Sequence, residues 1–183
     1  YTLESSGLRC AFQLRNSGKG DAPAGAGFHP YFTLGDGLID QYVLQVPVRS
    51  IQKYEYLLPT GAVLPVTGSQ YDLLQPRPIG KTVFNTCYMD PIRDEDGWAH
   101  IRLRNGTNGR AITVSLDRSC KYVVLYSGDP LPETHRRRAL AIEPMTCGTD
   151  AFNHPEFGLA TLKPDEVLSG AWEVAASGDV AQE

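Results

Sequence analysis

The sequence predicts an all-β protein, an antiparallel β-sandwich, from three observations. No segment of ten or more residues has the apolar spacing of an amphipathic helix. Turn signals such as Asn105-Gly106 and Asn108-Gly109 punctuate the chain. Between them, short segments alternate apolar and polar residues, as strands with one buried face do. These segments are residues 8–14, 42–48, 100–104, 112–116, 122–126 and 167–174.

Weaker segments complete the expected order of elements. Residues 55–65 form an extended piece punctuated by proline and glycine, and residues 159–162 form a further short strand. Residues 16–27 are rich in Gly, Ser, Asp, Ala and Pro, and residues 71–79 are rich in proline, so both are expected to be loops. No internal repeat with a solenoid or propeller period is present.

Length and composition favour one domain. A chain of 183 residues with 42% hydrophobic content can bury one ordinary core, and its 18 glycines and 13 prolines indicate many turns. We expect a single sandwich domain over residues 1–175. Residues 176–183 are small and polar, and are expected to form a frayed tail.

Charge, hydropathy and cysteine spacing exclude several classes. The net charge of −4 and the scattered basic residues argue against a nucleic-acid partner. No apolar run approaches the roughly 20 residues that a membrane helix needs. The four cysteines, which include no C-x-x-C pair, argue against a zinc knuckle or a dithiol redox site. Reduced, buried thiols in a cytoplasmic protein are the expectation.

Glu143 is the first candidate catalytic residue. The apolar residues 139–142 indicate a strand, and Glu143 follows them immediately before Pro144 and a turn-rich loop. Because a residue before proline is held extended, we expect Glu143 to be mounted rigidly at a strand end, as a positioned acid or base would be. A polar residue that simply leaves the sheet is the alternative interpretation.

His29 is the second candidate. It precedes Pro30 and is flanked by Phe28, Tyr31 and Phe32, so its imidazole is expected on an extended backbone beside apolar walls. Apolar surroundings can tune an imidazole pKa near neutrality. The alternative is a partly buried histidine hydrogen-bonded to a carbonyl group. No pair of histidines has metal-ligand spacing, and the chain has no cofactor signature.

A rigid histidine and a rigid glutamate together suit proton transfer between two oxygens of one small molecule, and sugars are such molecules. The motifs that carry these residues also resemble a known family, the aldose 1-epimerases, or galactose mutarotases, especially their bacterial branch. The resemblance spans about residues 1–174. Its motifs are residues 27–32 (GFHPYF), residues 71–72 with the loop 76–79, residues 142–146 (IEPMT) and residues 150–153 (DAFN).

The resemblance implies a fold and a reaction. The fold is the galactose mutarotase-like sandwich, and the substrate is a free aldose. Glu143 would take the proton of the anomeric hydroxyl while His29 protonates the ring oxygen, with base and acid on opposite sides of the sugar ring. No metal and no cofactor is implied. Tyr31 and Phe152 are candidate walls for the sugar, with ordinary core positions as the alternative.

Two departures from the family pattern are present. Asn85 stands where an aspartate that binds sugar hydroxyls is expected, and an amide can bond hydroxyls but carries no charge. The family's N-terminal portion, with further strands, an arginine and a second histidine for the site, is not found before Tyr1. We therefore expect unpaired edges that pair with a missing N-terminal segment or form a strand-sharing oligomer.

Two other functions remain open beside mutarotation. A non-catalytic carbohydrate-binding or assembly module would keep the sugar contacts without turnover. A hexose-6-phosphate 1-epimerase would need arginines near the site, and Arg77 and residues 136–138 are the candidates, although exposed loop arginines are usually only solvated.

Overall fold

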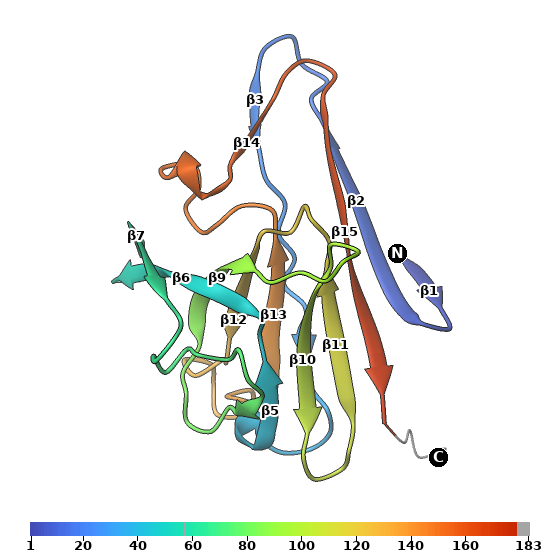
Figure 1. Ribbon diagram of the computed structural model, residues 1–183, viewed down its shortest axis with the longest axis vertical. Coiled ribbons are helices and arrows are strands. Elements are labelled where there is room, and N and C mark those ends of the chain that lie inside the picture. Colours follow the sequence, from blue (N-terminus) through green and yellow to red (C-terminus); the bar gives the residue numbers. More distant parts are fainter. Residues whose placement is uncertain (57, 179–183) are drawn as a thin grey trace.

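The computed structural model describes residues 1–56 and 58–178 and confirms the antiparallel β-sandwich. Figure 1 shows two large sheets and, at one end, a two-stranded ribbon that extends beyond them. The helical residues of the described chain lie in two single turns of 3-10 helix, Ile39–Gln41 and Pro155–Phe157. The expectation that no long helix interrupts the strands is therefore met in this part of the chain.

One sheet has seven strands and contains both the first and the last strand of the chain. Their spatial order is β1-β2-β15-β11-β10-β5-β8. In that order the bounds are Thr2–Glu4, Gly7–Arg15, Val167–Ser177, Ala111–Leu116, Ala99–Asn105, Tyr42–Gln45 and Arg77–Pro78.

The second sheet has six strands in the order β4-β13-β12-β9-β6-β7. In that order the bounds are Tyr31–Phe32, Leu140–Met145, Tyr122–Tyr126, Asn85–Pro91, Val48–Glu55 and Leu58–Pro65. The projecting ribbon pairs β3, Ala22–Ala24, with β14, Ala160–Leu162.

The main core lies between the two sheets and follows the period of two that a strand imposes on its side chains. In β10, Ile101 and Leu103 are buried and Arg102 and Arg104 are exposed. The six-stranded sheet contributes its own inward-facing set to the same cluster: Tyr88, Val123, Leu125, Leu140 and Ile142. The inward-facing side chains of these strands therefore pack in the core, and a binding site on these strands must lie on the outward face.

Several boundaries differ from the sequence expectation. The alternation of β15 continues to Ser177, which pairs with Ala111, so the strand runs into the segment expected to be a tail. Residues 179–183 of that segment lie outside the described residues. Strands β6 and β9 were not expected as separate elements, and β3 lies inside an expected loop. The short β3 contains Pro23, which explains why its composition resembled a loop.

Sheet edges carry exposed apolar side chains. β1 ends one sheet and β7 ends the other. Leu3 is 80% exposed on β1, and Leu58, Val63 and Leu64 are exposed on β7. Exposed apolar edges are the surfaces that pairing with another strand would cover.

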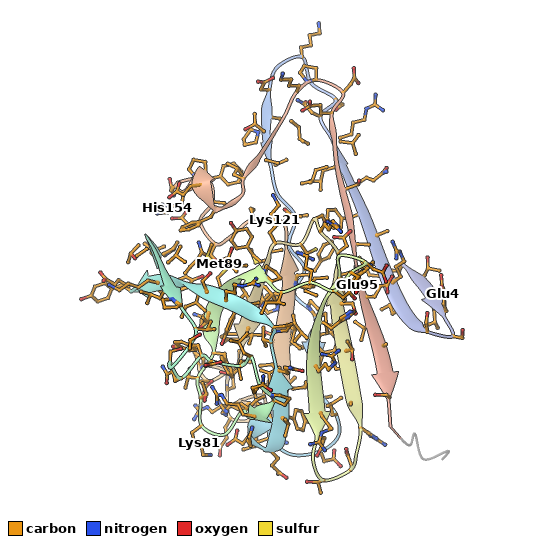
Figure 2. All side chains as sticks on the ribbon, viewed as in Figure 1. Glu4, Lys81, Met89, Glu95, Lys121 and His154 are labelled. Atoms are coloured by element: carbon orange, nitrogen blue, oxygen red, sulfur yellow. The ribbon has the colours of Figure 1, made fainter. Side chains whose placement is uncertain are left out.

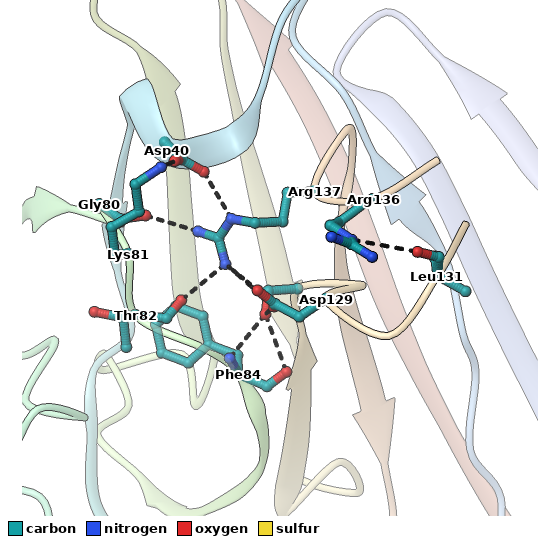
Figure 3. Close-up of polar contacts among 10 residues, drawn as sticks. Asp40, Gly80, Lys81, Thr82, Phe84, Asp129, Leu131, Arg136 and Arg137 are labelled. Carbon is teal, nitrogen blue, oxygen red and sulfur yellow. Dashed lines mark hydrogen bonds and ion pairs between the residues drawn. The ribbon is translucent and has the colours of Figure 1, made fainter. Parts of the chain in front are cut away.

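A buried arginine joins the loops at one end of the sandwich (Figure 3). The Arg137 guanidinium bonds Asp40 at 2.7 Å and Asp129 at 3.0 Å. It also donates to the carbonyl oxygens of Gly80 at 2.7 Å and Thr82 at 3.2 Å. The side chain of Arg137 is only 8% exposed, so the expectation that residues 136–138 are merely solvated is wrong for this residue.

The same network reaches the ends of two strands. Asp129 is bonded by the Ser127 hydroxyl, and the Phe84 backbone N–H donates to that hydroxyl at 2.8 Å. Phe84 directly precedes β9 and Ser127 directly follows β12. Because these hydrogen bonds are buried and paired with charges, they fix where the two strands meet.

We predict that Arg137→Ala destabilises the fold by about 3–5 kcal/mol, because it removes the buried cation that bonds both carboxylates and two carbonyls. Asp40 would keep only the exposed Lys81, and Asp129 only the Ser127 hydroxyl. Arg136→Ala is the matched control, since Arg136 is exposed and, among the described residues, its side chain bonds only the Leu131 carbonyl, at 3.4 Å. We expect that control to change stability by no more than about 0.5 kcal/mol. Urea unfolding measures both, and equal midpoints for the two variants would contradict the assignment.

Candidate active site

Three adjacent strands of the six-stranded sheet present the site on their outward face. Pairing sets Glu143 of β13 opposite Val124 of β12, which in turn lies opposite Cys87 of β9. In the next row on the same face, Tyr126 of β12 lies opposite Asn85 of β9. Since residues two apart share a face, Tyr126 and Asn85 lie on the same face as Glu143, Tyr126 on the neighbouring strand and Asn85 one strand further.

Glu143 lies inside β13 and not at its end, which corrects the sequence expectation. The strand continues through Pro144 to Met145 and pairs with β12 along its length. The Ile142 N–H and the Pro144 carbonyl both bond residues on the other side, at Pro30 and Phe28. The missing N–H of proline therefore faces away from β12, and the ladder between the two strands is not interrupted.

His29 is brought to Glu143 by a segment that runs antiparallel beside β13. The Phe28 N–H donates to the Pro144 carbonyl at 3.0 Å, and Gly27 bridges Met145. Along this extended segment Phe28 turns toward the core, where its ring lies 5.6 Å from that of Trp172. His29 consequently turns to the opposite face, the one that carries Glu143.

The imidazole and the carboxylate are in direct contact. His29 Nε2 lies 3.2 Å from Glu143 Oε1. The Glu143 side chain is 12% exposed and the His29 side chain is 53% exposed. The two groups therefore lie side by side, and the expectation of an acid and a base on opposite sides of a sugar ring is not met by this geometry.

Burial raises the pKa of Glu143 to about 7, although the charge of His29 acts to lower it. The carboxyl group therefore exchanges its proton near neutral pH, which is what a general base needs. Burial, together with nearby Tyr126 and Glu143, also raises the pKa of the Tyr31 hydroxyl. That phenol stays protonated beside the pair.

A cavity of about 380 Å³ opens in front of the pair. This volume lies within the range of sites for small molecules. A larger cavity, about 630 Å³, lies along β2 and β15, but its Arg9 and Asp117 are already bonded to Glu173 and to the Ala171 backbone. The smaller cavity is lined by His29, Asn85, Val124, Tyr126, Glu143, Met145 and Thr149.

The structure brings together three of the five expected site residues and places a fourth beside them. His29, Glu143 and Asn85 line one cavity. Tyr31 packs on His29 with ring centroids 4.9 Å apart, and its side chain is 48% exposed. Phe152 does not line this cavity and is 71% exposed, because it lies in the turn that follows Asp150.

Sequence reasoning missed Tyr126, Thr149, Val124 and Met145. The alternation of residues 122–126 indicates that Val124 and Tyr126 share a face, but not which sheet face the site occupies. Tyr126 also meets His29 edge to face at 6.4 Å. Thr149 lies in a loop with no periodic signal, so its position depends entirely on tertiary contacts.

The loop after β13 covers the neighbouring part of the same face. Tyr122 and Cys87 are buried under it together with Phe157 of the loop itself, and Met89 packs against them. Figure 2 labels Met89 and His154, which lie at this side of the six-stranded sheet. His154 is bonded to Glu156 at 3.0 Å and stacks near Phe157, so it is not part of the His29 cavity.

Two of the arginines proposed as phosphate ligands are used elsewhere. Arg77 donates to the backbone carbonyls of Asp72 and Gln70, and Arg137 belongs to the buried network. No lysine or arginine is found among the described residues that line the His29 cavity. In residues 1–56 and 58–178 no group of three His, Cys, Asp or Glu side chains is placed to hold a metal, and no helix is long and apolar enough to span a bilayer.

Comparison with known proteins finds relatives of this chain. Uncharacterized protein YihR of Escherichia coli K12 is 30% identical over 154 residues, which cover 84% of this chain and 47% of that protein. Galactose mutarotase of Rattus norvegicus is 26% identical over 187 residues, which cover 91% of this chain and 53% of that protein. The chain thus spans about half the length of these relatives.

Solved structures show the same fold at lower identity. A galactose mutarotase-like protein from Clostridium acetobutylicum superposes with a TM-score of 0.80 at 19% identity, over 97% of this chain and 54% of that one. Galactose 1-epimerase from Lactobacillus acidophilus NCFM gives 0.76 at 15% identity, over 96% and 55%. The family model for aldose 1-epimerase matches residues 1–174, and the chain therefore belongs to the aldose 1-epimerase family.

Proposed function

We propose that this chain interconverts the α and β anomers of free hexoses, with Glu143 as general base and His29 as general acid. The observation that carries the proposal is the contact of these two groups, 3.2 Å apart, at the wall of a cavity large enough for a hexose. Membership of the aldose 1-epimerase family supports the reaction class.

The side-by-side geometry suits the two atoms that must exchange protons. In a cyclic hexose, the anomeric hydroxyl oxygen and the ring oxygen are bonded to the same carbon. A base for one and an acid for the other must therefore approach the same edge of the ring. Glu143 and His29 occupy one edge of the cavity in this way.

The proton balance closes within the pair. With Glu143 ionised and His29 protonated, Glu143 takes the proton of the anomeric hydroxyl and His29 gives its proton to the ring oxygen. The bond between the anomeric carbon and the ring oxygen breaks, and an open-chain aldehyde forms. After rotation about the C1–C2 bond, both transfers reverse as the ring closes on the other face, so the pair returns to its starting state.

The cavity also supplies groups that can hold the sugar. The Asn85 amide can donate and accept hydrogen bonds with hydroxyl groups. The rings of Tyr126 and Tyr31, which pack around His29, are aromatic surfaces suited to the apolar patches of a sugar ring. We also propose a cytoplasmic location, since all four cysteines are free and Cys10, Cys87 and Cys120 are buried.

A carbohydrate-binding module without turnover is the second candidate, and the neutral Asn85 favours it. An amide at this place binds hydroxyls but adds no charge to the site. The two functions share one cavity and differ only in whether the proton transfers occur. Measurement of turnover beside sugar binding separates them.

We predict that the chain accelerates the change in optical rotation of fresh α-D-glucose or α-D-galactose. Glu143→Gln and His29→Asn should each lower this rate by about 10²–10⁴-fold, the usual contribution of a general acid or base. His154→Asn is the control, because it removes a histidine outside the cavity. Sugar binding by calorimetry without any acceleration would leave the binding module as the function.

The rate should also depend on pH. Because Glu143 must be ionised to accept a proton, kcat/KM should rise as the pH passes about 7, the pKa of Glu143. A profile measured between about pH 5 and pH 9 that stays flat would contradict the assigned roles.

The stability of the fold should also depend on the ionisation of Glu143. The pKa of Glu143 is raised from 4.5 to about 7 in the fold, so the folded state binds this proton more tightly than the unfolded state. Its stabilising contribution is present below about pH 4.5 and is lost as the pH rises through about 7.

Glu143→Gln should therefore stabilise the protein at about pH 8, and by less at about pH 5. Urea unfolding at both pH values measures the difference. Glu133→Gln, at an exposed position, is the control and should show no such gain. An equal effect of Glu143→Gln at the two pH values would show that the carboxyl group titrates normally.

A further inference from the structure

Thr149 lies across the cavity from the catalytic pair and is held there by two residues of β6. The Tyr54 hydroxyl donates to Thr149 Oγ1 at 2.8 Å. The Thr149 backbone N–H donates to Gln52 Oε1 at 3.0 Å. A threonine in a loop is thus fixed at both its backbone and its side chain by the strand beneath it.

The loop that carries Thr149 packs on a buried polar side chain, Gln52. Gln52 is only 1% exposed, and a buried amide destabilises a fold unless its hydrogen bonds are made. The neighbouring Gly148 leaves room for it, since a Cβ atom at Gly148 would lie 2.9 Å from Gln52 Nε2. A side chain at position 148 would therefore force the Gln52 amide to shift.

The hydroxyl proton of Thr149 is available for a hydrogen bond to a molecule in the cavity. Burial raises the pKa of Tyr54, so its phenol remains a donor and occupies one lone pair of Thr149 Oγ1. The Cys87 thiol also lies within hydrogen-bond reach of the Thr149 side chain, but its sulfur is only a weak acceptor. Among the described residues no oxygen accepts a hydrogen bond from Thr149 Oγ1, and this side chain lines the cavity.

The position of Thr149 determines which part of a sugar it can reach. Glu143, Val124 and Cys87 lie in one row across three strands, so Glu143 and Cys87 are about 10 Å apart along the sheet. Thr149 adjoins Cys87 at the far end of this row. A hexose whose C1 lies at Glu143 and whose ring lies over Val124 presents C4, the carbon opposite C1, to Thr149.

We propose that the Thr149 hydroxyl donates a hydrogen bond to the C4 hydroxyl of the sugar and so determines which C4 epimer the site prefers. Tyr54 and Gln52 act through Thr149 as positioning residues. This inference rests on the proposed function, because it places the anomeric carbon at Glu143. It concerns a different residue and a different part of the sugar from the proton transfer.

The test measures binding of two sugars that cannot be epimerised, 1,5-anhydroglucitol and 1,5-anhydrogalactitol. They lack the anomeric hydroxyl and differ only at C4, so affinity is read without turnover. Calorimetry on the intact chain should show a preference for one of them. Thr149→Val should weaken the binding of that sugar by about fivefold, the contribution of one ordinary hydrogen bond, and leave the affinity for the other sugar unchanged.

Thr149→Ser is the matched control, because it keeps the hydroxyl and should restore the preference to within about twofold. Tyr54→Phe should lower the preference partly, since Thr149 then loses its fixed orientation. The 4-deoxy form of the preferred sugar should bind the wild type and Thr149→Val equally.

Three results would overturn the inference. Unchanged affinities in Thr149→Val would show that the hydroxyl makes no contact with the sugar. If Thr149→Val weakens the binding of both sugars equally and Thr149→Ser does not restore it, Thr149 has a structural role only. If the wild type binds neither sugar, the proposed function fails as well, whereas the first two results leave it standing.

Discussion

The period-two alternation of the six-stranded sheet is the constraint on which both the core and the site depend. In β13, Ile142 packs in the core while Glu143 faces outward, and β12 and β9 repeat this division with Leu125 against Tyr126 and Tyr88 against Asn85. A slip of one residue would exchange these faces and place a carboxylate in the core. Burial of the aliphatic side chains therefore fixes the register that assembles the cavity.

Contacts from several elements hold Glu143 and His29 in place. The segment that carries His29 is bonded along β13, and Phe28 anchors it in the aromatic group with Trp172. The Arg137 network holds the ends of β9 and β12, where Asn85 and Tyr126 lie. The result is a carboxylate that is largely withdrawn from water yet in contact with an imidazole, an arrangement that brings its proton exchange into the neutral range.

The sequence predicted the fold class, most strands and the two central residues, because local alternation and the two proline-bound motifs are visible in the chain. It wrongly placed Glu143 at a strand end, because Pro144 was expected to end the strand. The strand continues because Pro144 turns its missing N–H away from β12, and the sequence does not show on which side β12 lies. It missed Thr149 and the burial of Arg137, because both depend on partners distant in the chain, Tyr54 and Asp40. Phe152 shows the reverse case, in which an aromatic residue beside a motif lies away from the cavity.

Glu143 is a buried carboxylate whose pKa is raised by burial and lowered in part by the charge of His29. Carbon-13 NMR of the labelled Glu143 carboxyl group, titrated in the wild type and in His29→Asn, tests it most directly. We predict a midpoint near 7 in the wild type and a higher one in the variant, because the charge of His29 lowers the pKa of Glu143. A midpoint near the ordinary 4.5, unchanged by the substitution, would contradict it.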